Sequence, residues 1–376
     1  MRSAVIVSLV WLASPLALWP QAPAGGRRIT INPDGSVIVE NAVVPLPGLM
    51  TEGSKEVLMR TRPTEGPGAP VPLPAGISDI SEVRRIYNEN LKPNVDHMRS
   101  VFPVDIEETT IEGISAAIIT PKGGVPEKNK GRLFLNGPGG GFRTGVRANG
   151  LLISIPVAAV LGVEVVSILY RQAPEYRFPA ASEDLMKVWN HFTKIYKPRN
   201  IGMVGCSAGG SLISQTTAML IQEGAPTPGV LGVYCAGLGA AGSGDSQFFA
   251  ALSVTNAPAR QSQGGAAALT PAGPFAAGNP TQNYYTGVNM NQFIVNPTLD
   301  EKLLAKFPPT IFFSATRDFA MSASAYSHWK LLKAGVDSEL MIFDGLYHGF
   351  MTNPDFPEAQ EGYKIAAKFF DKHLGR

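Results

Sequence analysis

The sequence predicts an α/β fold, in which a mostly parallel sheet of eight strands is covered by helices on both faces. Short apolar runs of strand length recur along the chain, and amphipathic segments at helical spacing alternate with them. Glycine-rich turns mark several of the junctions between the two. This alternation is typical of a parallel sheet whose strands are buried on both sides.

The strands are expected at six apolar runs and one hairpin. The hairpin lies within VDIEETTIEGISAAIITP (104–121), where two strand-like runs flank Glu112-Gly113. The six runs are RLFLN (132–136), VEVVSILY (163–170), IGMVG (201–205), VLGVYC (230–235), TIFFSA (310–315) and ELMIFD (339–344).

The helices are expected between these strands. ISDISEVRRIYNENLK (77–92) is a helix candidate with Ser81 near its start, and SLISQTTAML follows the glycines at 209–210. SASAYSHWKLLKAG ends in Gly335, a suitable C-terminal cap, and QEGYKIAAKFFDKHL (360–374) closes the chain. SEDLMKVWNHFTKIY places five apolar residues at helical spacing: Leu185, Val188, Trp189, Phe192 and Ile195.

Composition excludes several classes of protein. With 376 residues, 44% hydrophobic and 16% charged, the chain can bury a large core. Its 32 Lys and Arg balance 30 Asp and Glu to a net charge of +2, and no basic stripe carries interleaved aromatic residues, so no nucleic-acid partner is expected. No His/Cys cluster has zinc spacing and no EF-hand pattern occurs, so we expect neither a metal nor another cofactor.

Residues 1–24 resemble a secretory signal peptide. Arg2 precedes an apolar run, and Ala22-Pro23-Ala24 supplies small residues for cleavage. An uncleaved anchor is the alternative, but Pro15 breaks a run that falls short of the roughly 20 apolar residues that span a bilayer. We therefore expect export, to the periplasm or beyond, and no stable membrane span.

The remaining chain is expected to hold one catalytic domain with a cap. Residues 25–100 combine an extension, irregular and rich in Pro and Gly up to about 80, with part of the cap. Residues 101–376 form the α/β domain. Within it, about 237–298 break the alternation with Gly, Ala, Gln and Asn, and an insertion of this length in a compact domain is typical of a lid over a pocket, disorder being the alternative.

The stretch GCSAGG (205–210) places Ser207 where a predicted strand becomes a helix. Glycines and a serine at this point are also ordinary turn and helix-start residues. The G-x-S-x-G pattern forms a nucleophile elbow, which holds the serine hydroxyl clear of the sheet. The pentapeptide occurs by chance too often to decide, so the chain must also supply a base, an acid and an oxyanion hole.

His348 is the best candidate for the base, because it alone among five histidines follows the carboxyl end of a late strand. Asp318 follows the preceding strand and is the candidate acid, with a helix N-cap as the alternative role. The chain order Ser207, Asp318, His348 is that of the α/β-hydrolase triad and favours the catalytic assignment.

The loop GPGGGF, Gly137 to Phe142, is the candidate oxyanion hole. Three consecutive glycines after a strand let the backbone curl, so that the N–H groups of Gly140 and Gly141 point into the site together with that of Ala208. A merely flexible glycine loop is the alternative.

The chain resembles the bacterial hormone-sensitive-lipase family of α/β-hydrolases. Four segments carry the resemblance, which spans about 100–376: PGGGFRTG (138–145), YRQAPEYRFPAASEDL (170–185), GCSAGG, and AGVDSELMIFDGLYHGF (334–350) preceded by RDFAM. The resemblance implies a cap closing an acyl pocket, and esterase activity on short to medium acyl chains. Two residues depart from the family pattern: Pro138 replaces the histidine of the HGGG loop, and Cys206 replaces an acidic residue before the nucleophile.

We therefore predict a serine hydrolase that cleaves a small-molecule carboxylic ester through an acyl-enzyme. The alternatives are a deacetylase, lactonase or amidase for a specialised small molecule and, from another class, a non-catalytic receptor on the same fold. A homodimer is left open. Cys206 and Cys235 either pair as a disulfide or, as we favour, remain buried thiols on neighbouring strands. Candidate substrate-binding residues, with packing as the alternative role, are Phe142, Cys206, Phe248, Tyr284 and Tyr285.

Overall fold

The computed structural model describes residues 29–31, 37–39, 46–60, 79–239, 244–246 and 284–375. The expected signal peptide and most of the expected cap insertion, Phe248 included, lie outside the described residues. The chain divides into two compact units, Met1–Pro45 and Leu46–Arg376. In the first unit, β1 (Ile29–Ile31) pairs antiparallel with β2 (Val37–Val39). The expected domain boundaries stay a prediction.

The second unit is built on an eight-stranded sheet with the order β10-β9-β8-β7-β5-β6-β4-β3. Six strands run parallel, while β3 and β4 form an antiparallel hairpin that pairs antiparallel with β6. The predicted α/β fold is confirmed. The strands are β3 (Val104–Ile111), β4 (Ile114–Pro121), β5 (Leu133–Gly137), β6 (Glu164–Ile168), β7 (Ile201–Cys206), β8 (Val230–Tyr234), β9 (Thr310–Arg317) and β10 (Ser338–Tyr347).

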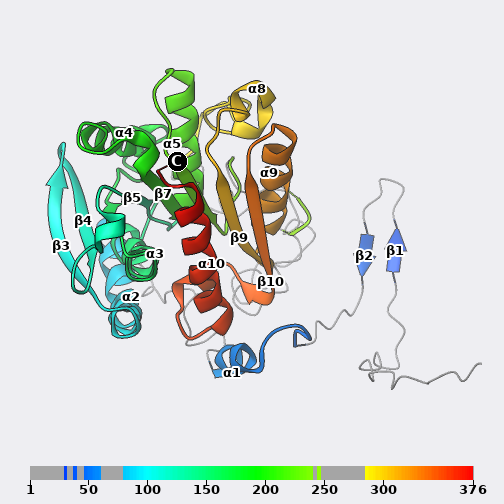
Figure 1. Ribbon diagram of the computed structural model, residues 1–376. Coiled ribbons are helices and arrows are strands. Elements are labelled where there is room, and N and C mark those ends of the chain that lie inside the picture. The colour runs from blue at the N-terminus through cyan, green and yellow to red at the C-terminus, as the bar shows by residue number, and fades with distance from the viewer. Residues whose placement is uncertain are drawn as a thin grey trace, which may run out of the picture. The chain divides into compact units, whose positions relative to one another are not determined.

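Helices cover both faces of this sheet (Figure 1). The α-helices are α1 (Glu52–Arg60), α2 (Ile80–Val101), α3 (Val146–Leu161), α4 (Ala180–Phe192), α5 (Ala208–Gln222), α8 (Glu301–Leu304), α9 (Met321–Lys333) and α10 (Pro357–His373). Short 3-10 helices lie at Glu127–Asn129, Pro198–Asn200, Pro297–Leu299 and Phe350–Thr352. Within the described residues, no helix combines the length and apolarity needed to cross a bilayer.

Alternation along the strands divides the core into two layers. In β5, Phe134 faces the layer formed with α2, α3 and α10, while Leu133 and Leu135 face α4, α5 and α9. All three side chains are fully buried. Because neighbouring residues of a strand point to opposite faces, a strand covered on both sides is apolar throughout, which is why these runs show no polar alternation.

Three local expectations need correction. The region up to about 80 is not wholly irregular, because it contains β1, β2 and α1. The helix expected at 77–92 begins at Ile80 and continues through Pro93 to Val101; Ser81 lies near its start as expected, and its N–H donates a hydrogen bond to the N-cap Asp79. Ile195 lies beyond the end of α4 and is 65% exposed. Gly335, by contrast, takes the expected left-handed conformation after α9 (φ 80°).

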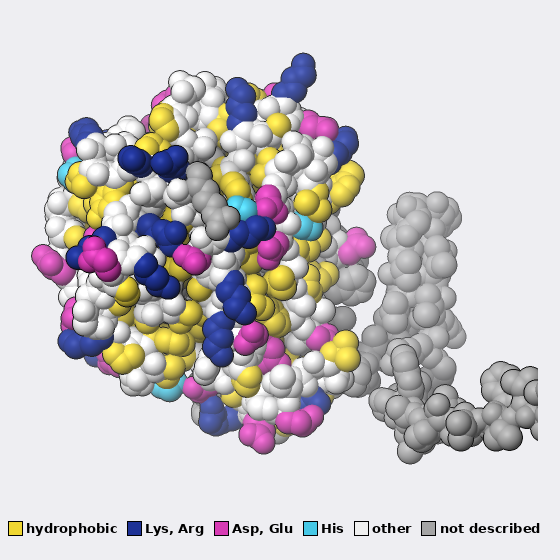
Figure 2. All heavy atoms as spheres, viewed as in Figure 1, with side chains coloured by type: hydrophobic (Ala, Val, Ile, Leu, Met, Phe, Trp, Pro, Cys, Tyr) yellow, Lys and Arg dark blue, Asp and Glu magenta, His cyan; other side chains and the backbone are white. Residues whose placement is uncertain are grey.

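Acidic and basic side chains are interspersed on the face shown in Figure 2. Most ion pairs are exposed and contribute little to stability. The pair formed by Arg171 and Asp184 differs, because the Asp184 side chain is only 1% exposed. Its carboxylate accepts hydrogen bonds from the Arg171 backbone N–H (2.8 Å) and from Nε (2.9 Å). Arg171 and Asp184 therefore hold the loop after β6 against α4.

Replacing Asp184 should destabilise the fold far more than replacing its exposed neighbour. Asp184→Ala leaves Arg171 without its buried partner, and we expect the free energy of unfolding to fall by about 3–5 kcal/mol. Glu183→Ala, which removes an exposed contact to the same guanidinium, should cost less than about 1 kcal/mol. Urea unfolding measures both, and equal losses would contradict a structural role for this pair.

Candidate active site

Ser207 occupies the junction between β7 and α5 with an unusual backbone. Its φ of 58° and ψ of −124° are rare for a residue with a side chain and match a nucleophile elbow. Only glycines fit around it: a Cβ on Gly205 would lie 2.3 Å from the Gly209 carbonyl oxygen, and one on Gly209 would lie 1.8 Å from the Gly137 carbonyl oxygen. The glycines of the motif thus allow helix, strand and loop to meet at the serine.

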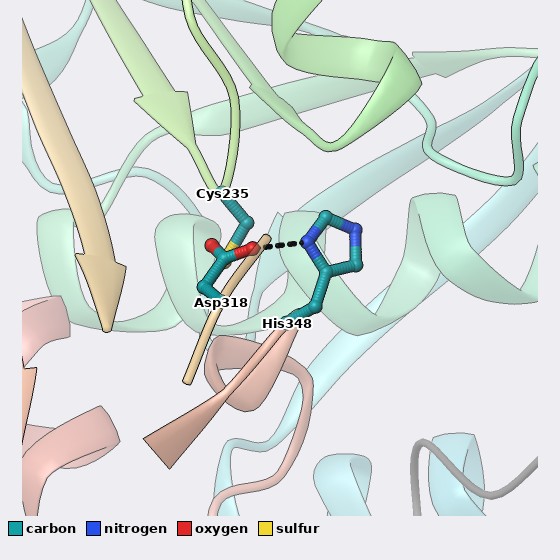
Figure 3. A group of neighbouring side chains, drawn as sticks. All are labelled: Cys235, Asp318 and His348. Atoms are coloured by element: carbon teal, nitrogen blue, oxygen red, sulfur yellow. Dashed lines mark hydrogen bonds and ion pairs between the residues drawn. The ribbon is translucent and has the colours of Figure 1, made fainter. Parts of the chain in front are cut away.

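The structure brings Ser207, His348 and Asp318 together in a hydrogen-bonded series. The Ser207 Oγ lies 2.8 Å from Nε2 of His348, and Nδ1 of the same ring lies 2.7 Å from Oδ1 of Asp318. Ser207 follows β7, Asp318 follows β9 and His348 follows β10. The three catalytic candidates therefore lie together at the carboxyl ends of three parallel strands. Figure 3 shows the imidazole facing the Asp318 carboxylate.

Asp318 is fully buried, and every contact around it favours its charged form. Its carboxylate accepts hydrogen bonds from the Ser314 hydroxyl (2.8 Å) and the Ala320 N–H (2.9 Å), besides the one from His348. Burial alone would raise the pKa of Asp318, but His348 and these donors hold it below its usual value. The N-cap of α9 is Ala320 and it has no side-chain cap, so the alternative role of Asp318 as a helix N-cap is wrong; its carboxylate bonds to the Ala320 N–H just before the helix and to His348.

The imidazole of His348 is held by charge and by stacking. Burial lowers the pKa of His348, but the negative charge and hydrogen bond of Asp318 outweigh burial and leave that pKa raised. The ring of Phe319 stacks on the imidazole with centroids 4.1 Å apart. Sequence reasoning missed Phe319, although its position directly after the acid was a usable signal.

The glycine loop lies against the elbow. A Cβ on Gly139 would sit 2.7 Å from the Cys206 carbonyl oxygen and 3.5 Å from the Ser207 Cβ. Gly140 and Gly141 both have positive φ, at 118° and 64°, which curls the loop. Ala208 is the first residue of α5, where N–H groups lack helical partners and the helix dipole favours negative charge. Gly139 and Ala208 therefore lie directly beside Ser207, and the assignment of the Gly140, Gly141 and Ala208 N–H groups to an oxyanion hole stays a prediction.

Tyr170 supports this loop at both ends. Its hydroxyl donates a hydrogen bond to the Pro138 carbonyl oxygen (2.9 Å), and its ring lies 5.9 Å from that of Phe142. The Phe142 carbonyl in turn accepts a hydrogen bond from the Ala173 N–H (2.8 Å). Pro138 occupies the position of the family histidine, so the bracing of the loop comes from the segment after β6.

The candidate pocket residues that are described lie mostly in packing positions. Phe142 is fully buried and stacks on Tyr284 with centroids 4.3 Å apart. The Tyr284 hydroxyl accepts a hydrogen bond from the Ala181 N–H (2.8 Å), and that of Tyr285 bonds to Gln215. Packing, the alternative weighed for them, thus describes these three aromatic residues better than exposure to a substrate.

Cys206 and Cys235 are free, buried thiols, as the favoured alternative expects. The sulfur of Cys235, Oδ of Asp318 and a ring nitrogen of His348 lie within 4.8 Å of one another, and their donor types could hold a metal ion. Figure 3 shows Cys235 directly beside the Asp318 carboxylate. Asp318 and His348 are, however, already committed to each other by a 2.7 Å hydrogen bond.

Fold and site together define a hydrolase with a serine nucleophile elbow on an α/β sheet. A model of the alpha/beta hydrolase fold family matches residues 138–352, more than half of the chain, and the chain belongs to this family. The resemblance to bacterial hormone-sensitive-lipase esterases is also confirmed. The match contains Ser207, Asp318 and His348 as well as residues 138–142 of the glycine loop.

Solved structures of esterases share the architecture. The crystal structure of the esterase E25 superimposes with a TM-score of 0.71 at 25% identity, covering 90% of this chain and 99% of that one. An esterase from the bacterial hormone-sensitive lipase family gives a TM-score of 0.66 at 21% identity, with coverages of 86% and 99%. At that lower identity, the likeness establishes the fold.

Curated relatives match shorter stretches. Arylacetamide deacetylase of Oryctolagus cuniculus is 30% identical over 127 residues, 32% of each chain. Versiconal hemiacetal acetate esterase of Emericella nidulans is 37% identical over 60 residues, 16% of this chain and 21% of that protein. The chain thus spans a third or less of the length of these relatives in the alignments.

Distorting the glycine loop should reduce turnover while leaving the fold intact. In Gly140→Ala the new Cβ would lie 1.8 Å from the Thr144 carbonyl oxygen, at a φ that side chains rarely adopt, so the loop must move. We expect kcat on a p-nitrophenyl ester to fall about 100-fold or more, with KM changed only a few-fold. Gly124→Ala, equally left-handed but facing open space, is the matched control and should retain turnover. Unchanged kcat in Gly140→Ala would exclude this loop from the oxyanion hole.

The pH dependence of turnover should follow His348. A general base must be neutral, so activity is lost as pH falls through its pKa, which lies above the ordinary histidine value of about 6.5. Asp318→Asn removes the charge that raises this pKa, so the acid limb of kcat/KM should move to lower pH while kcat drops by about three to four orders of magnitude. A profile of the variant that keeps the wild-type limb would contradict the coupling.

Proposed function

We propose that this protein is a carboxylic ester hydrolase that acts on small esters through an acyl-enzyme formed on Ser207. The single observation that carries the proposal is the uninterrupted series of hydrogen bonds from Ser207 through His348 to Asp318. A serine hydroxyl is unreactive at neutral pH without an adjacent base, and the fold supplies one together with the acid that orients it.

In the proposed first half-reaction, the Ser207 oxygen attacks the ester carbonyl while Nε2 of His348 takes its proton. Asp318 stabilises the imidazolium through Nδ1. The carbonyl oxygen becomes an oxyanion, which the N–H groups of Gly140, Gly141 and Ala208 stabilise. When the tetrahedral intermediate collapses, His348 returns the proton to the alkoxide, and the alcohol leaves.

In the second half-reaction, water replaces the alcohol. His348 takes a proton from water as its oxygen attacks the acyl carbonyl, the same N–H groups stabilise the second oxyanion, and the bond to Ser207 breaks. The serine oxygen recovers its proton from His348, and the carboxylic acid is released. No group outside the described site is required to balance either step.

Short acyl chains are the proposed substrates. The names of the two curated relatives, an arylacetamide deacetylase and a hemiacetal acetate esterase, both refer to acetyl groups. The aromatic cluster of Phe142, Tyr284 and Tyr285 closes one side of the glycine loop with buried rings. Space for a long acyl chain would have to come from elsewhere.

Ser207→Ala tests the nucleophile. Wild-type protein should be labelled stoichiometrically by a fluorophosphonate probe and hydrolyse p-nitrophenyl esters from acetate to palmitate with a maximum at short chains. The variant should lose the label and at least about four orders of magnitude in kcat. Ser211→Ala, one turn further along α5, is the matched control, since its hydroxyl bonds to the Gly239 carbonyl oxygen. Persistent labelling of Ser207→Ala would overturn the assignment.

A second candidate function is deacetylation of an arylamide. It is favoured by the alignment with arylacetamide deacetylase, which spans 127 residues at 30% identity. The chemistry would differ only in the leaving group, which His348 would have to protonate as an amine rather than an alcohol. Comparing kcat/KM for p-nitrophenyl acetate and p-nitroacetanilide, which share the acyl group, distinguishes the two functions.

A further inference from the structure

Two thiols flank the catalytic series, and the proposed mechanism uses neither. Cys206 immediately precedes the nucleophile at the end of β7, and Cys235 follows the last residue of β8. They are the only cysteines of the chain, and both are buried. The two side chains interact, because Cys235 lowers the pKa of Cys206 while Cys206 raises that of Cys235.

The backbone places these residues within reach of a covalent link. Cys206 is in register with Tyr234 on the neighbouring parallel strand, so Cys235 is offset by one position. With strands about 4.8 Å apart and a rise of about 3.3 Å per residue, the Cα atoms are about 6 Å apart, within the disulfide range. An offset of one would normally send the side chains to opposite faces. Cys235 leaves the strand conformation, with a left-handed φ of 51°, and both cysteines belong to the same layer of the core.

Both sulfurs are tied to parts of the catalytic site. The Cys235 sulfur accepts a hydrogen bond from the Gly349 N–H (3.2 Å), in the residue after the base, and the Cys235 N–H is fixed to the Phe313 carbonyl oxygen (2.7 Å). The Cys206 carbonyl oxygen lies against Gly139 of the glycine loop. A change in the distance between the sulfurs is therefore transmitted to the nucleophile, the base and the loop.

We propose that Cys206 and Cys235 form an oxidative modification site, at which a hydroperoxide converts the two thiols into a disulfide that lowers turnover. The Cys206 thiolate attacks the distal peroxide oxygen, the O–O bond breaks, and the alcohol or water leaves with the displaced proton. Cys206 is then a sulfenic acid. The Cys235 sulfur attacks this sulfur, the S–O bond breaks, and hydroxide leaves as water with the proton of Cys235. Two thiols are oxidised and one hydroperoxide is reduced.

The order of reaction follows from the effect of each thiol on the other and from their burial. The hydrogen bond from Cys235 lowers the pKa of Cys206, and the same bond raises the pKa of Cys235. The thiolate is the reactive form of cysteine, so Cys206 ionises and reacts first. Cys206 also lies beside Ser207, which is partly exposed, whereas Cys235 is fully buried and serves as the resolving thiol.

Loss of activity follows from geometry. A disulfide fixes the sulfurs about 2.05 Å apart, closer than any hydrogen-bonded pair of thiols. Cys206 must shift to make this bond, and the strained Ser207 shifts with it. We expect the oxidised protein to keep its fold and to lose at least tenfold in kcat, with a smaller change in KM.

The experiment treats the full, reduced chain with hydrogen peroxide and measures three quantities. Free thiols are counted after denaturation, the intact mass and the cross-linked peptide are determined by mass spectrometry, and ester hydrolysis is assayed before and after dithiothreitol. We expect the thiol count to fall from two to none, a mass lower by two hydrogens, and recovery of kcat with dithiol. Reversal by dithiol distinguishes the disulfide from methionine sulfoxide, which dithiothreitol does not reverse.

Cys206→Ala and Cys235→Ala are the controls, each compared with itself before and after peroxide. Neither can form the intramolecular link, so the ratio of oxidised to reduced activity should stay near one in whichever variant folds. Retention of both thiols, a link between two chains, or an irreversible sulfinic acid without a link would overturn the proposal. The predicted loss of turnover rests on the proposed function, whereas the thiol count and the mass do not. A protein that forms the disulfide but hydrolyses no ester would therefore contradict the proposed function and leave the modification site intact.

Discussion

The close contact of three backbone segments at Ser207 is the constraint on which the site depends. β7, α5 and the glycine loop meet where a Cβ on Gly205 or Gly209 would overlap a carbonyl oxygen. Ser207 itself has a backbone conformation that costs about 1–3 kcal/mol and persists only when its surroundings enforce it. The Ser207 N–H donates to the Tyr234 carbonyl oxygen (2.8 Å), which anchors the strained residue to the next strand. The packing of these segments and this hydrogen bond therefore hold Ser207 in its strained backbone conformation.

The parallel sheet explains how residues distant in sequence reach this point. β7, β9 and β10 all end at the same edge, so the loop after each contributes one member of the hydrogen-bonded series. The order of these loops along the chain is fixed by topology, which is why a serine, an acid and a histidine in that order are informative. The base is stabilised twice, by the buried charge of Asp318 and by the face of Phe319. The charge sets its protonation, while stacking limits the orientations of its ring.

Patterns that depend on single segments could be predicted from the sequence, and contacts between segments could not. The apolar runs identified all eight sheet strands of the large unit, because strands buried on both faces leave a continuous signal. The three residues of the hydrogen-bonded series followed from their places after strands. Helix α1, by contrast, lies among prolines and glycines and has only three buried residues, so its periodicity is weak. Phe142 looked like a pocket residue, but its stacking on Tyr284, 142 positions later, is visible only in three dimensions.

The two departures from the family pattern have different physical consequences. Pro138 lacks an imidazole, yet its carbonyl oxygen accepts the Tyr170 hydroxyl, and Tyr170 is held near α4 by the neighbouring ion pair of Arg171 and Asp184. The glycine loop therefore keeps a brace, supplied through a buried salt bridge rather than from within the loop. No residue adjacent to Cys206 in the sequence supplies the charge that is lost there. Cys206 replaces a charged group beside the nucleophile with a thiol whose nearest polar partner is another thiol, Cys235. A carboxylate there would repel the negative charge that develops on the oxyanion, whereas the thiol pair makes the elbow sensitive to oxidation.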